Sequence, residues 1–276
     1  MTDAPRVLLT NDDGIDAPGI RAIYDALAAD ADVTVVAPAD DQSGTGMSRS
    51  WSSDSLTVHE HELGYAVEGT PTDCVAAGLT ALGLQPDVVV SGCNDGPNMG
   101  AHILGRSGTV GAAMEAAFLE VPAIAVSVYD PSGEVPAGAT PTSEEFTFAK
   151  AATRYLLNEV LDETFSAADY LNVNAPTTGA DPAMRITHPA LAYDVVYDDE
   201  SVIEFEAGDP TTIELHDRSW QVFLDHETAE AMGTDRRAMV DGEVSVSPLL
   251  VPRGIASDET NPEGSEIEGF EAGEWL

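Results

Sequence analysis

The sequence RVLLTNDDG at residues 6–14 decides the fold and points to a functional site. Its apolar part, Val7 to Leu9, is too short for a helix and is bounded by polar residues, which predicts a buried strand. Asn11, Asp12 and Asp13 follow at the carboxyl end of that strand, where open α/β sheets bind their ligands. An Asp-Gly pair alone would indicate only a turn, so the position of the two aspartates after a strand is what predicts a site.

The adjacent carboxylates of Asp12 and Asp13 indicate a bound cation. Two like charges in one crevice repel each other, and a cation beside them allows both to stay ionised. Oxygen ligands favour Mg²⁺, Mn²⁺ or Ca²⁺ over zinc. Two further oxygen donors follow later strands, namely Ser43 in the polar loop 40–48 and Asn94 after an apolar run. We expect them at the same edge of the sheet, with a flexible surface loop as the alternative for 40–48.

The residues that follow alternate between helical and strand patterns. Apolar residues at Ile20, Ile23 and Leu27 predict an amphipathic helix, and residues 33–37 predict the next buried strand. Such a strand–helix–strand unit implies a parallel sheet. Further strands are expected at 65–68, 87–91, 123–128 and 170–176, and further helices from Thr70, at 112–119 and at 143–161. The fold class is therefore α/β with a mostly parallel sheet.

The pattern changes after this α/β part. Short alternating segments between Met184 and Phe223 predict β-hairpins that protrude from the core, an arrangement that often serves oligomerisation. Residues 233–242 are polar and predict turns, and 243–249 predict a late strand. We therefore divide the chain into a catalytic core at 1–180 joined by the strand region 233–250, a β-hairpin arm at 181–232, and an acidic, mobile tail at 251–276.

A second candidate site begins at Ser107, Gly108 and Thr109, which precede the helix expected at 112–119. The free N–H groups and the dipole of a helix N-terminus bind phosphate well, and Arg106 could add a charge-assisted contact. An ordinary capped helix start is the alternative for this segment taken alone. No Gly-Lys-Ser/Thr follows, so the segment is not a Walker A loop.

The composition is strongly acidic. The 276 residues include 49 acidic and 11 basic ones, for a formal net charge of -38. The acidic residues alternate with apolar runs, which indicates a folded protein with an acidic surface, as is typical of halophiles. The same charge argues against binding to nucleic acids or to anionic membranes, because both require basic patches.

The cysteines and the N-terminus bear on the compartment. Cys74 and Cys93 lie outside any CxxC pair, so we expect buried thiols in a reducing environment. The first residues lack the basic and apolar regions of a signal peptide, and no apolar run approaches the ~18 residues that span a membrane. These features predict a cytoplasmic protein.

Several loops together resemble one family. The motifs TNDDGI at 10–15, GTPTDC at 69–74, SGCN at 91–94 and SGTVGAA at 107–113 are similar to those of the SurE family of survival-protein nucleotidases. Later motifs at 233–235 and 244–249 also match, so the resemblance extends over about residues 6 to 250. Two segments depart from the family pattern, since residues 39–42 are acidic rather than Arg-rich and Arg106 stands where tyrosine is usual.

The resemblance implies a Rossmann-like three-layer core and a phosphomonoesterase that uses one divalent metal ion, Mg²⁺ or Mn²⁺. The implied substrates are nucleoside 5′-monophosphates, with 3′-monophosphates open, and the implied assembly is a homo-oligomer, dimer or tetramer. The implied metal ligands are Asp12, Asp13, Ser43 and Asn94. The implied phosphate pocket comprises Asn11, Asn98, Ser107, Gly108 and Thr109, and of all these residues Asp12, Asn11 and Ser107 are the implied catalytic ones.

Two questions stay open at the level of sequence. Water could attack the phosphorus directly, or Asp12 could act as a nucleophile and form an aspartyl phosphate. A non-catalytic nucleotide-binding module could also use the same fold, because fold does not fix function. A purely structural oligomer would leave the clustered Asp, Asn and Ser loops unexplained.

Overall fold

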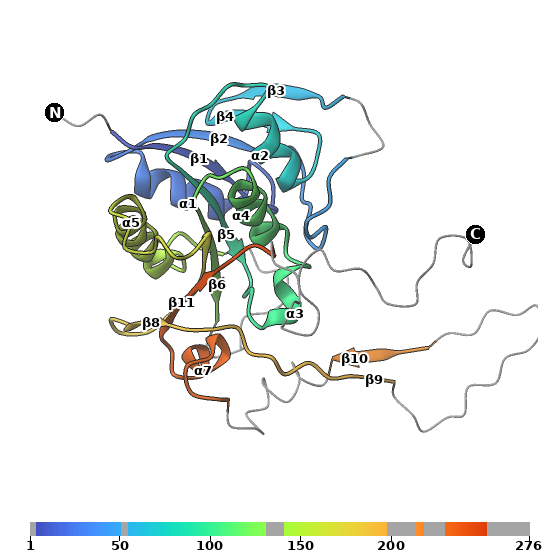
Figure 1. The fold of residues 1–276 in the computed structure, drawn as a ribbon, viewed down its shortest axis with the longest axis vertical. Helices are drawn as coiled ribbons and strands as arrows, with labels where there is room; N and C mark the ends of the chain where they lie inside the picture. Colours follow the sequence, from blue (N-terminus) through green and yellow to red (C-terminus); the bar gives the residue numbers. More distant parts are fainter. Residues whose placement is uncertain (1–3, 51–54, 131–140, 198–212, 218–229, 253–276) are drawn as a thin grey trace, which may run out of the picture.

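The computed structural model describes residues 4–50, 55–130, 141–197, 213–217 and 230–252. Its centre is a nine-stranded sheet with the order β3-β4-β2-β1-β5-β6-β7-β11-β8 (Figure 1). The strands of this sheet are β1 (Arg6–Thr10), β2 (Asp32–Pro38), β3 (Val58–His61), β4 (Gly64–Val67), β5 (Val88–Asp95), β6 (Ala123–Tyr129), β7 (Tyr170–Pro176), β8 (Met184–Ile186) and β11 (Val244–Leu249).

The first strand lies in the middle of this sheet. Leu8 is level with Thr34 of β2 on one side and with Val89 of β5 on the other, and both pairings are parallel. The β2–β4, β5–β6, β6–β7 and β11–β8 pairings are also parallel, whereas β3–β4 and β11–β7 are antiparallel. The prediction of a mostly parallel sheet is confirmed.

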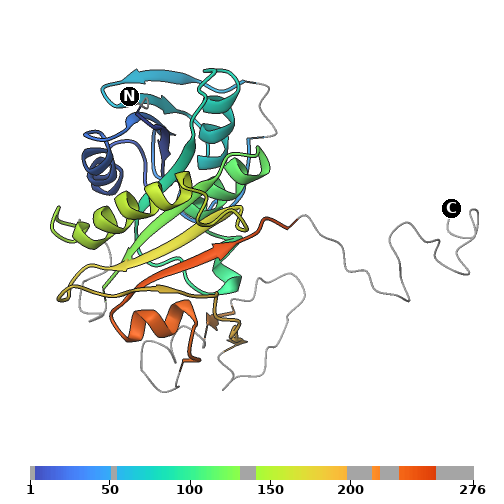
Figure 2. The same ribbon diagram turned by 60° about the vertical axis from the view of Figure 1, so that its left-hand side comes forward.

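Helices cover both faces of the sheet and complete three layers (Figures 1 and 2). Val7 and Leu9 of β1 pack in one apolar cluster with residues of α1 (Pro18–Leu27) and α5 (Thr147–Leu161). Leu8, which points to the opposite face, packs with residues of α2 (Pro71–Leu79) and α4 (Gly108–Phe118). The side chains of β1 thus alternate between two cores, as expected for a strand that is buried on both faces.

The described part of the arm region divides between two sheets. Met184–Ile186 forms β8, which pairs with β11 at the edge of the main sheet and so lies outside any hairpin. Only β9 (Val195–Tyr197) and β10 (Leu215–Asp217) form a separate antiparallel pair, which extends away from the core in Figure 1. Within the predicted arm, residues 198–212 and 218–229 lie outside the described residues, as does most of the predicted tail.

Several of the sequence predictions for individual elements differ from the structure. The helix expected from residue 143 begins at Thr147, because the Glu145 carboxylate accepts hydrogen bonds from Thr142 in a turn before it. Strand β5 continues through Asn94 to Asp95, since both residues pair with β6 after an irregularity in register. The residues expected to form turns near 233–242 contain the helix α7 (Asp235–Val240), which is capped by the Thr234 hydroxyl.

Candidate metal and phosphate site

The predicted site residues converge at the carboxyl ends of the parallel strands. A cavity of about 320 Å³ opens there. Its lining includes six of the predicted residues, contributed by segments after β1 and β2, by the end of β5 and the loop after it, and by the start of α4: Asp12, Asp13, Ser43, Asn94, Asn98 and Ser107. The same lining includes Asp95 and Arg106, and Arg106 is the only basic residue among the described ones at this cavity. The expectation that these loops meet at one edge of the sheet agrees with this geometry.

Asp12 is buried and held by α4. Its Oδ1 atom accepts a hydrogen bond from the Thr109 hydroxyl at 2.5 Å, and its side chain is only slightly exposed. Burial raises the pKa of Asp12, and the hydrogen bonds from Thr109 partly oppose this. A β-carbon on Gly108 would lie 2.8 Å from both Cβ and Oδ2 of Asp12, so glycine is needed for this close approach.

Asp13 carries the strongest electrostatic signature of the site. Burial and the neighbouring charge of Asp12 raise the pKa of Asp13 to about 7, with further repulsion from Asp41 and Asp95. A cation placed among these carboxylates would remove the repulsion. The clustered negative charge therefore fits the divalent ion that the adjacent aspartates led us to expect.

The remaining donors fit a hard cation. Asn94 uses its amide nitrogen to donate to Gly96 O at 2.6 Å, which leaves the amide oxygen as its ligand atom. The Ser43 hydroxyl donates to Asp41 Oδ1 at 2.6 Å, so its oxygen keeps lone pairs for a metal. Within the described residues no group of three or more His, Cys, Asp or Glu is placed to hold a metal. A metal centre here would therefore need Ser43 and Asn94 as well as two carboxylates.

The phosphate side of the cavity is formed by the start of α4. Ser107 is its N-cap and accepts a hydrogen bond from Val110 N at 3.1 Å. The helix therefore begins at Gly108, four residues before the start expected at residue 112, and its N-terminus lies at the cavity that Ser107 lines. Thr109 was expected in the phosphate pocket, but its hydroxyl is engaged with Asp12.

Asn98 is fixed by a buried network from β6 and β7. Its backbone N–H donates to Asn174 Oδ1 at 2.8 Å, and its carbonyl accepts from Asn172 and Asn174. Its side-chain amide donates to the Ser127 hydroxyl at 2.9 Å. Because all four residues are buried, the loop that carries Asn98 is held in one position at the cavity wall.

A second clamp holds the same loop two residues later. The buried Asp235 of α7 accepts a hydrogen bond from Gly100 N at 2.7 Å and another from Ala190 N at 2.9 Å. The sequence reasoning missed Asn172, Asn174 and Asp235 as supports of the site. Two asparagines at alternate positions of an otherwise apolar strand were the signal that could have identified the first two.

Asn11 was predicted to belong to the phosphate pocket, but its contacts are with the turn after β1. It is fully buried, and its side-chain amide donates to Gly14 O at 2.8 Å, which shapes the turn that carries Asp12 and Asp13. It does not line the cavity.

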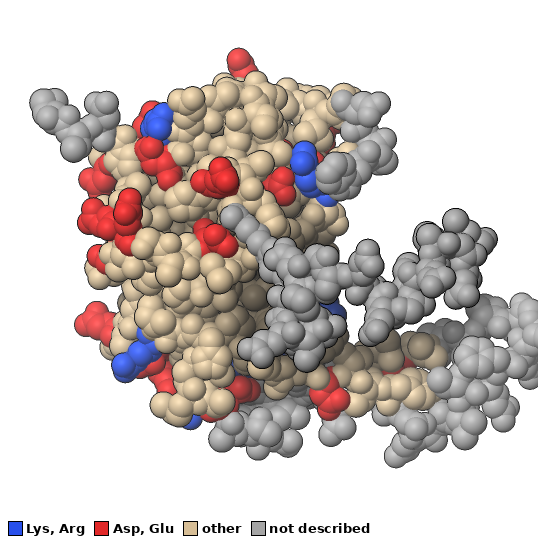
Figure 3. Space-filling view, in the orientation of Figure 1, with Lys and Arg blue, Asp and Glu red and all other residues tan. Residues whose placement is uncertain are grey.

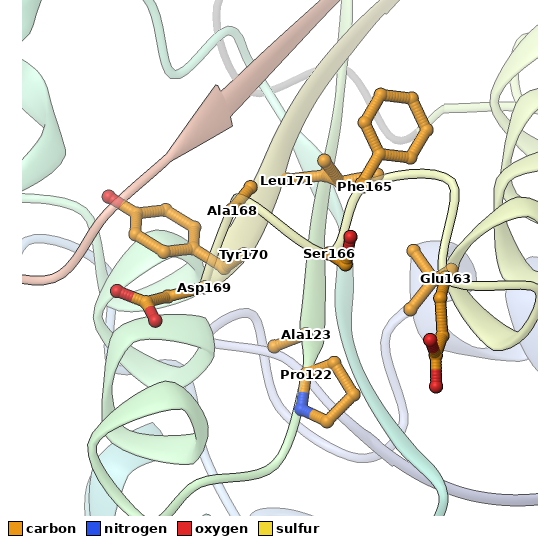
Figure 4. A pocket seen from close by; sticks show the side chains of 10 residues that line it. Pro122, Ala123, Glu163, Phe165, Ser166, Ala168, Asp169, Tyr170 and Leu171 are labelled. Carbon is orange, nitrogen blue, oxygen red and sulfur yellow. The ribbon is translucent and has the colours of Figure 1, made fainter.

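A larger cavity, of about 380 Å³, lies at the opposite end of the strands (Figure 4). It is lined by residues around the starts of β6 and β7, including Pro122 and Tyr170, and by the turn after α5. Figure 4 shows Glu163 and Asp169 as its charged side chains. This cavity contains none of the predicted site residues.

The remaining expectations concern the acidic surface, membrane-spanning helices and the two cysteines. Figure 3 shows acidic side chains scattered over the visible face, with few basic ones between them. Among the described residues, none of the helices is long and apolar enough to cross a membrane. Cys74 and Cys93 are buried and unbridged, as the sequence predicted, and burial raises the pKa of both thiols.

Comparisons with known proteins agree with the motif resemblance. The family model described as Survival protein SurE matches residues 7–193. The 5′-nucleotidase SurE of Natronomonas pharaonis is 53% identical over 92% of this chain and 95% of its own length. That of Halobacterium salinarum is 52% identical, with coverages of 91% and 93%.

A solved structure gives the same result for the fold. The crystal structure of the SurE protein from Aquifex aeolicus superposes with a TM-score of 0.71 at 30% identity, covering 91% of this chain and 95% of that one. The Rossmann-like α/β fold class is therefore confirmed. Matching motifs, family model, relatives and fold lead to one conclusion: the chain belongs to the SurE family.

Proposed function

We propose that this chain is a metal-dependent phosphomonoesterase that hydrolyses nucleoside 5′-monophosphates to nucleosides and phosphate. The carrying observation is that Asp12 and Asp13 share one cavity with Ser107 at the N-terminus of α4. A site for a cation thus faces a site for an anion, which is the pairing that phosphoryl transfer requires. Relatives named 5′-nucleotidase that align over nine-tenths of the chain support the same activity.

The proposed roles follow from the contacts of each side chain. Asp12, Asp13, Ser43 and Asn94 would hold one Mg²⁺ or Mn²⁺ ion, which when bound would polarise the phosphoryl oxygens and lower the pKa of a water molecule. Thr109 fixes the orientation of the Asp12 carboxylate. Ser107 and the N–H groups at the start of α4 would bind the phosphate oxygens, and Asn98 would line the other side.

The position of Asp12 favours direct attack by water over an aspartyl phosphate. Its Oδ1 atom is held by a short hydrogen bond, and a β-carbon built on Gly108 would lie only 2.8 Å from its Oδ2 atom. A carboxylate held in this way is suited to be a ligand, whereas a nucleophile would have to reach the phosphorus in line with the leaving group. Failure to trap a phosphoenzyme during turnover is the expected result.

We also propose a cytoplasmic homo-oligomer, dimer or tetramer, that is assembled through the arm. Apolar side chains are exposed along this region, with Leu191 at 84% and Leu215 at 62% exposure. Leu215 lies on the protruding β9–β10 pair and Leu191 precedes β9, and exposed leucines of this kind are typical of surfaces that a second copy covers. Sedimentation analysis in molar KCl would distinguish this assembly from a monomer.

Phosphate release from a panel of nucleoside 5′- and 3′-monophosphates tests the proposed function. Each substrate is assayed in molar KCl with Mg²⁺, with Mn²⁺ or with EDTA. We expect release that requires metal and disappears in Asp13→Ala, while Asp25→Ala, which changes an exposed aspartate of α1, retains it. Folded wild-type protein that binds nucleotide but releases no phosphate with either metal would instead identify a binding module.

A further inference from the structure

A cluster of aromatic and cationic side chains lies beside the cavity and has no role in the chemistry proposed above. It consists of His102 in α3 (Ala101–Leu104), Arg106 after that helix, and Tyr193 between β8 and β9. The rings of His102 and Tyr193 stack with their centroids 4.4 Å apart at an interplanar angle of 23°. Arg106 Cζ lies 5.0 Å from the centre of the Tyr193 ring, and Arg106 Nη2 donates to the Tyr193 hydroxyl at 3.0 Å. We call these three residues the stacking platform.

The stacking platform is continuous with the metal and phosphate cavity through Arg106. This residue lines the cavity, and the next residue along the chain is Ser107, the N-cap of α4. A molecule whose phosphate group binds at the start of α4 therefore has the platform next to it. The part of the substrate beyond the phosphate is the part that the platform can contact.

Backbone hydrogen bonds hold the stacking platform in place. Ala101 N donates to Ala190 O at 2.9 Å, which ties the chain before Tyr193 to the start of α3. The Asp235 carboxylate accepts from Gly100 N and Ala190 N and fixes the same two segments from a third element. Tyr193 nevertheless stays 45% exposed, so a ligand can reach this residue. The platform is thus both ordered and open.

The chemistry of the stacking platform suits a flat aromatic ligand. Nucleobases stack on tyrosine and histidine rings and on the planar guanidinium of arginine. We propose that the stacking platform binds the base of the nucleoside monophosphate, with Tyr193 as the principal stacking residue. This inference rests on the proposed function and extends it from the phosphate to the base.

The stacking platform also determines which substrates should gain affinity from stacking of their base. Stacking is tolerant of base identity because every base has a π-face, so we expect purine and pyrimidine monophosphates to be accepted. Stacking also depends little on screening by salt, unlike a charge contact to the phosphate. The base contact therefore remains effective at the molar salt concentrations that suit an acidic protein.

A comparison of two substrates tests the inference. Adenosine 5′-monophosphate carries a base and ribose 5-phosphate does not, although both present the same phosphate. We expect Tyr193→Ala to lower kcat/KM for adenosine 5′-monophosphate about tenfold, mainly through KM, and to leave ribose 5-phosphate unchanged. Tyr193→Phe keeps the ring and should retain most of the activity. Tyr155→Ala removes a comparably exposed tyrosine from α5 and is the matched control.

Three results would overturn the inference. One is an equal loss for both substrates, which would assign Tyr193 to the phosphate site or to the fold. Another is no loss for either substrate with an unchanged oligomer mass. The third is unchanged kinetics together with a change in oligomer mass for Tyr193→Ala, which would assign the tyrosine to an interface between copies of the chain.

Equilibrium dialysis of adenosine 5′-monophosphate in EDTA separates this inference from the proposed function. One outcome is that Tyr193→Ala binds adenosine 5′-monophosphate more weakly than the wild type, while the wild type releases no phosphate with any metal. That outcome would support the platform and contradict the nucleotidase proposal. The other outcome is that the wild type releases phosphate in a metal-dependent way, while Tyr193→Ala leaves the affinity for adenosine 5′-monophosphate unchanged. That outcome would support the nucleotidase proposal and contradict the platform.

Discussion

At the level of single residues, Asp12 and Asp13 repel each other electrostatically, and the same two carboxylates are the proposed ligands of the metal ion. Asp13 has a pKa of about 7 because it is buried beside Asp12. Asp13→Asn removes one of two adjacent like charges, one buried and one half-buried, so we expect the metal-free variant to unfold at the same temperature as the wild type or higher. It should lose the stabilisation that Mg²⁺ gives to the wild type, which at about 100 times Kd amounts to about 2.7 kcal/mol. Thermal unfolding in EDTA and in excess Mg²⁺ measures both effects.

Asp25→Asn, on the exposed side of α1, is the control for this comparison. It should respond to Mg²⁺ as the wild type does. A metal-induced rise in unfolding temperature that persists in Asp13→Asn would contradict the assignment of Asp13 as a ligand.

Gly108 provides a steric test of the same site. A β-carbon there would lie 2.8 Å from Asp12 Cβ and Oδ2, so Gly108→Ala must displace either the carboxylate or the start of α4. A displacement of about 1 Å can reduce catalysis about a hundredfold, and we expect a loss of that order in kcat/KM. The helix itself should persist, because alanine favours helices more than glycine does.

Gly105→Ala is the matched substitution, since a β-carbon at Gly105 would meet nothing within 4 Å. Steady-state kinetics of the two variants, with circular dichroism as a check of folding, gives the comparison. Equal activity in both would mean that the contact between Gly108 and Asp12 is not needed.

At the scale of elements, the N-terminus of α2 couples stability to pH. Asp73 accepts hydrogen bonds from Thr70 N at 3.0 Å and from the Ser50 hydroxyl at 2.7 Å. Burial raises the pKa of Asp73, but these hydrogen bonds outweigh burial and hold the pKa below its ordinary value. Because the folded pKa lies below the unfolded one, the stabilisation is complete above about pH 4 and is lost as pH falls through the folded pKa.

Asp73→Asn should therefore lower the free energy of unfolding by about 1 kcal/mol near neutral pH. The difference from the wild type should shrink as the pH falls below about 4, when the wild-type carboxylate becomes protonated. Denaturant unfolding of both proteins across this pH range measures the trend. A difference that stays constant down to the lowest pH would show that the charge of Asp73 is not the cause.

The elements also show what the sequence alone can predict. The strand at Val7–Leu9 and the α2 cap at Thr70 were predictable because their signals are local, namely an apolar run and a Thr-Pro-x-Asp pattern. The strand β3 and the pairing of β8 with β11 were not predicted, because they depend on partners elsewhere in the chain. The role of Thr109 was also missed, since its hydroxyl meets an aspartate 97 residues away.

For the molecule as a whole, the net charge of -38 makes salt a condition of stability. Screening acts over about 10 Å at 0.1 M salt but only about 3 Å at 1 M, so repulsion among the acidic residues grows on dilution. We expect the unfolding temperature to fall steadily as KCl is lowered from molar to 0.1 M. Thermal scans with sucrose in place of KCl provide the control, because a neutral solute cannot screen charge. An unfolding temperature that is independent of KCl would contradict this account.

The clamp on the loop at Asn98–Gly100 has a consequence for biosynthesis. One side of that loop is held by Asn174 and the other by Asp235, which is 135 residues further along the chain than Gly100. A growing polypeptide emerges from its N-terminus, so Asp12 and Asp13 are present long before Asp235 exists. The nascent chain therefore carries its cation-binding carboxylates early but completes the support of the cavity wall only after Asp235 has been added. Catalytic competence is in this sense a property that the chain acquires with α7, the last helix among the described residues.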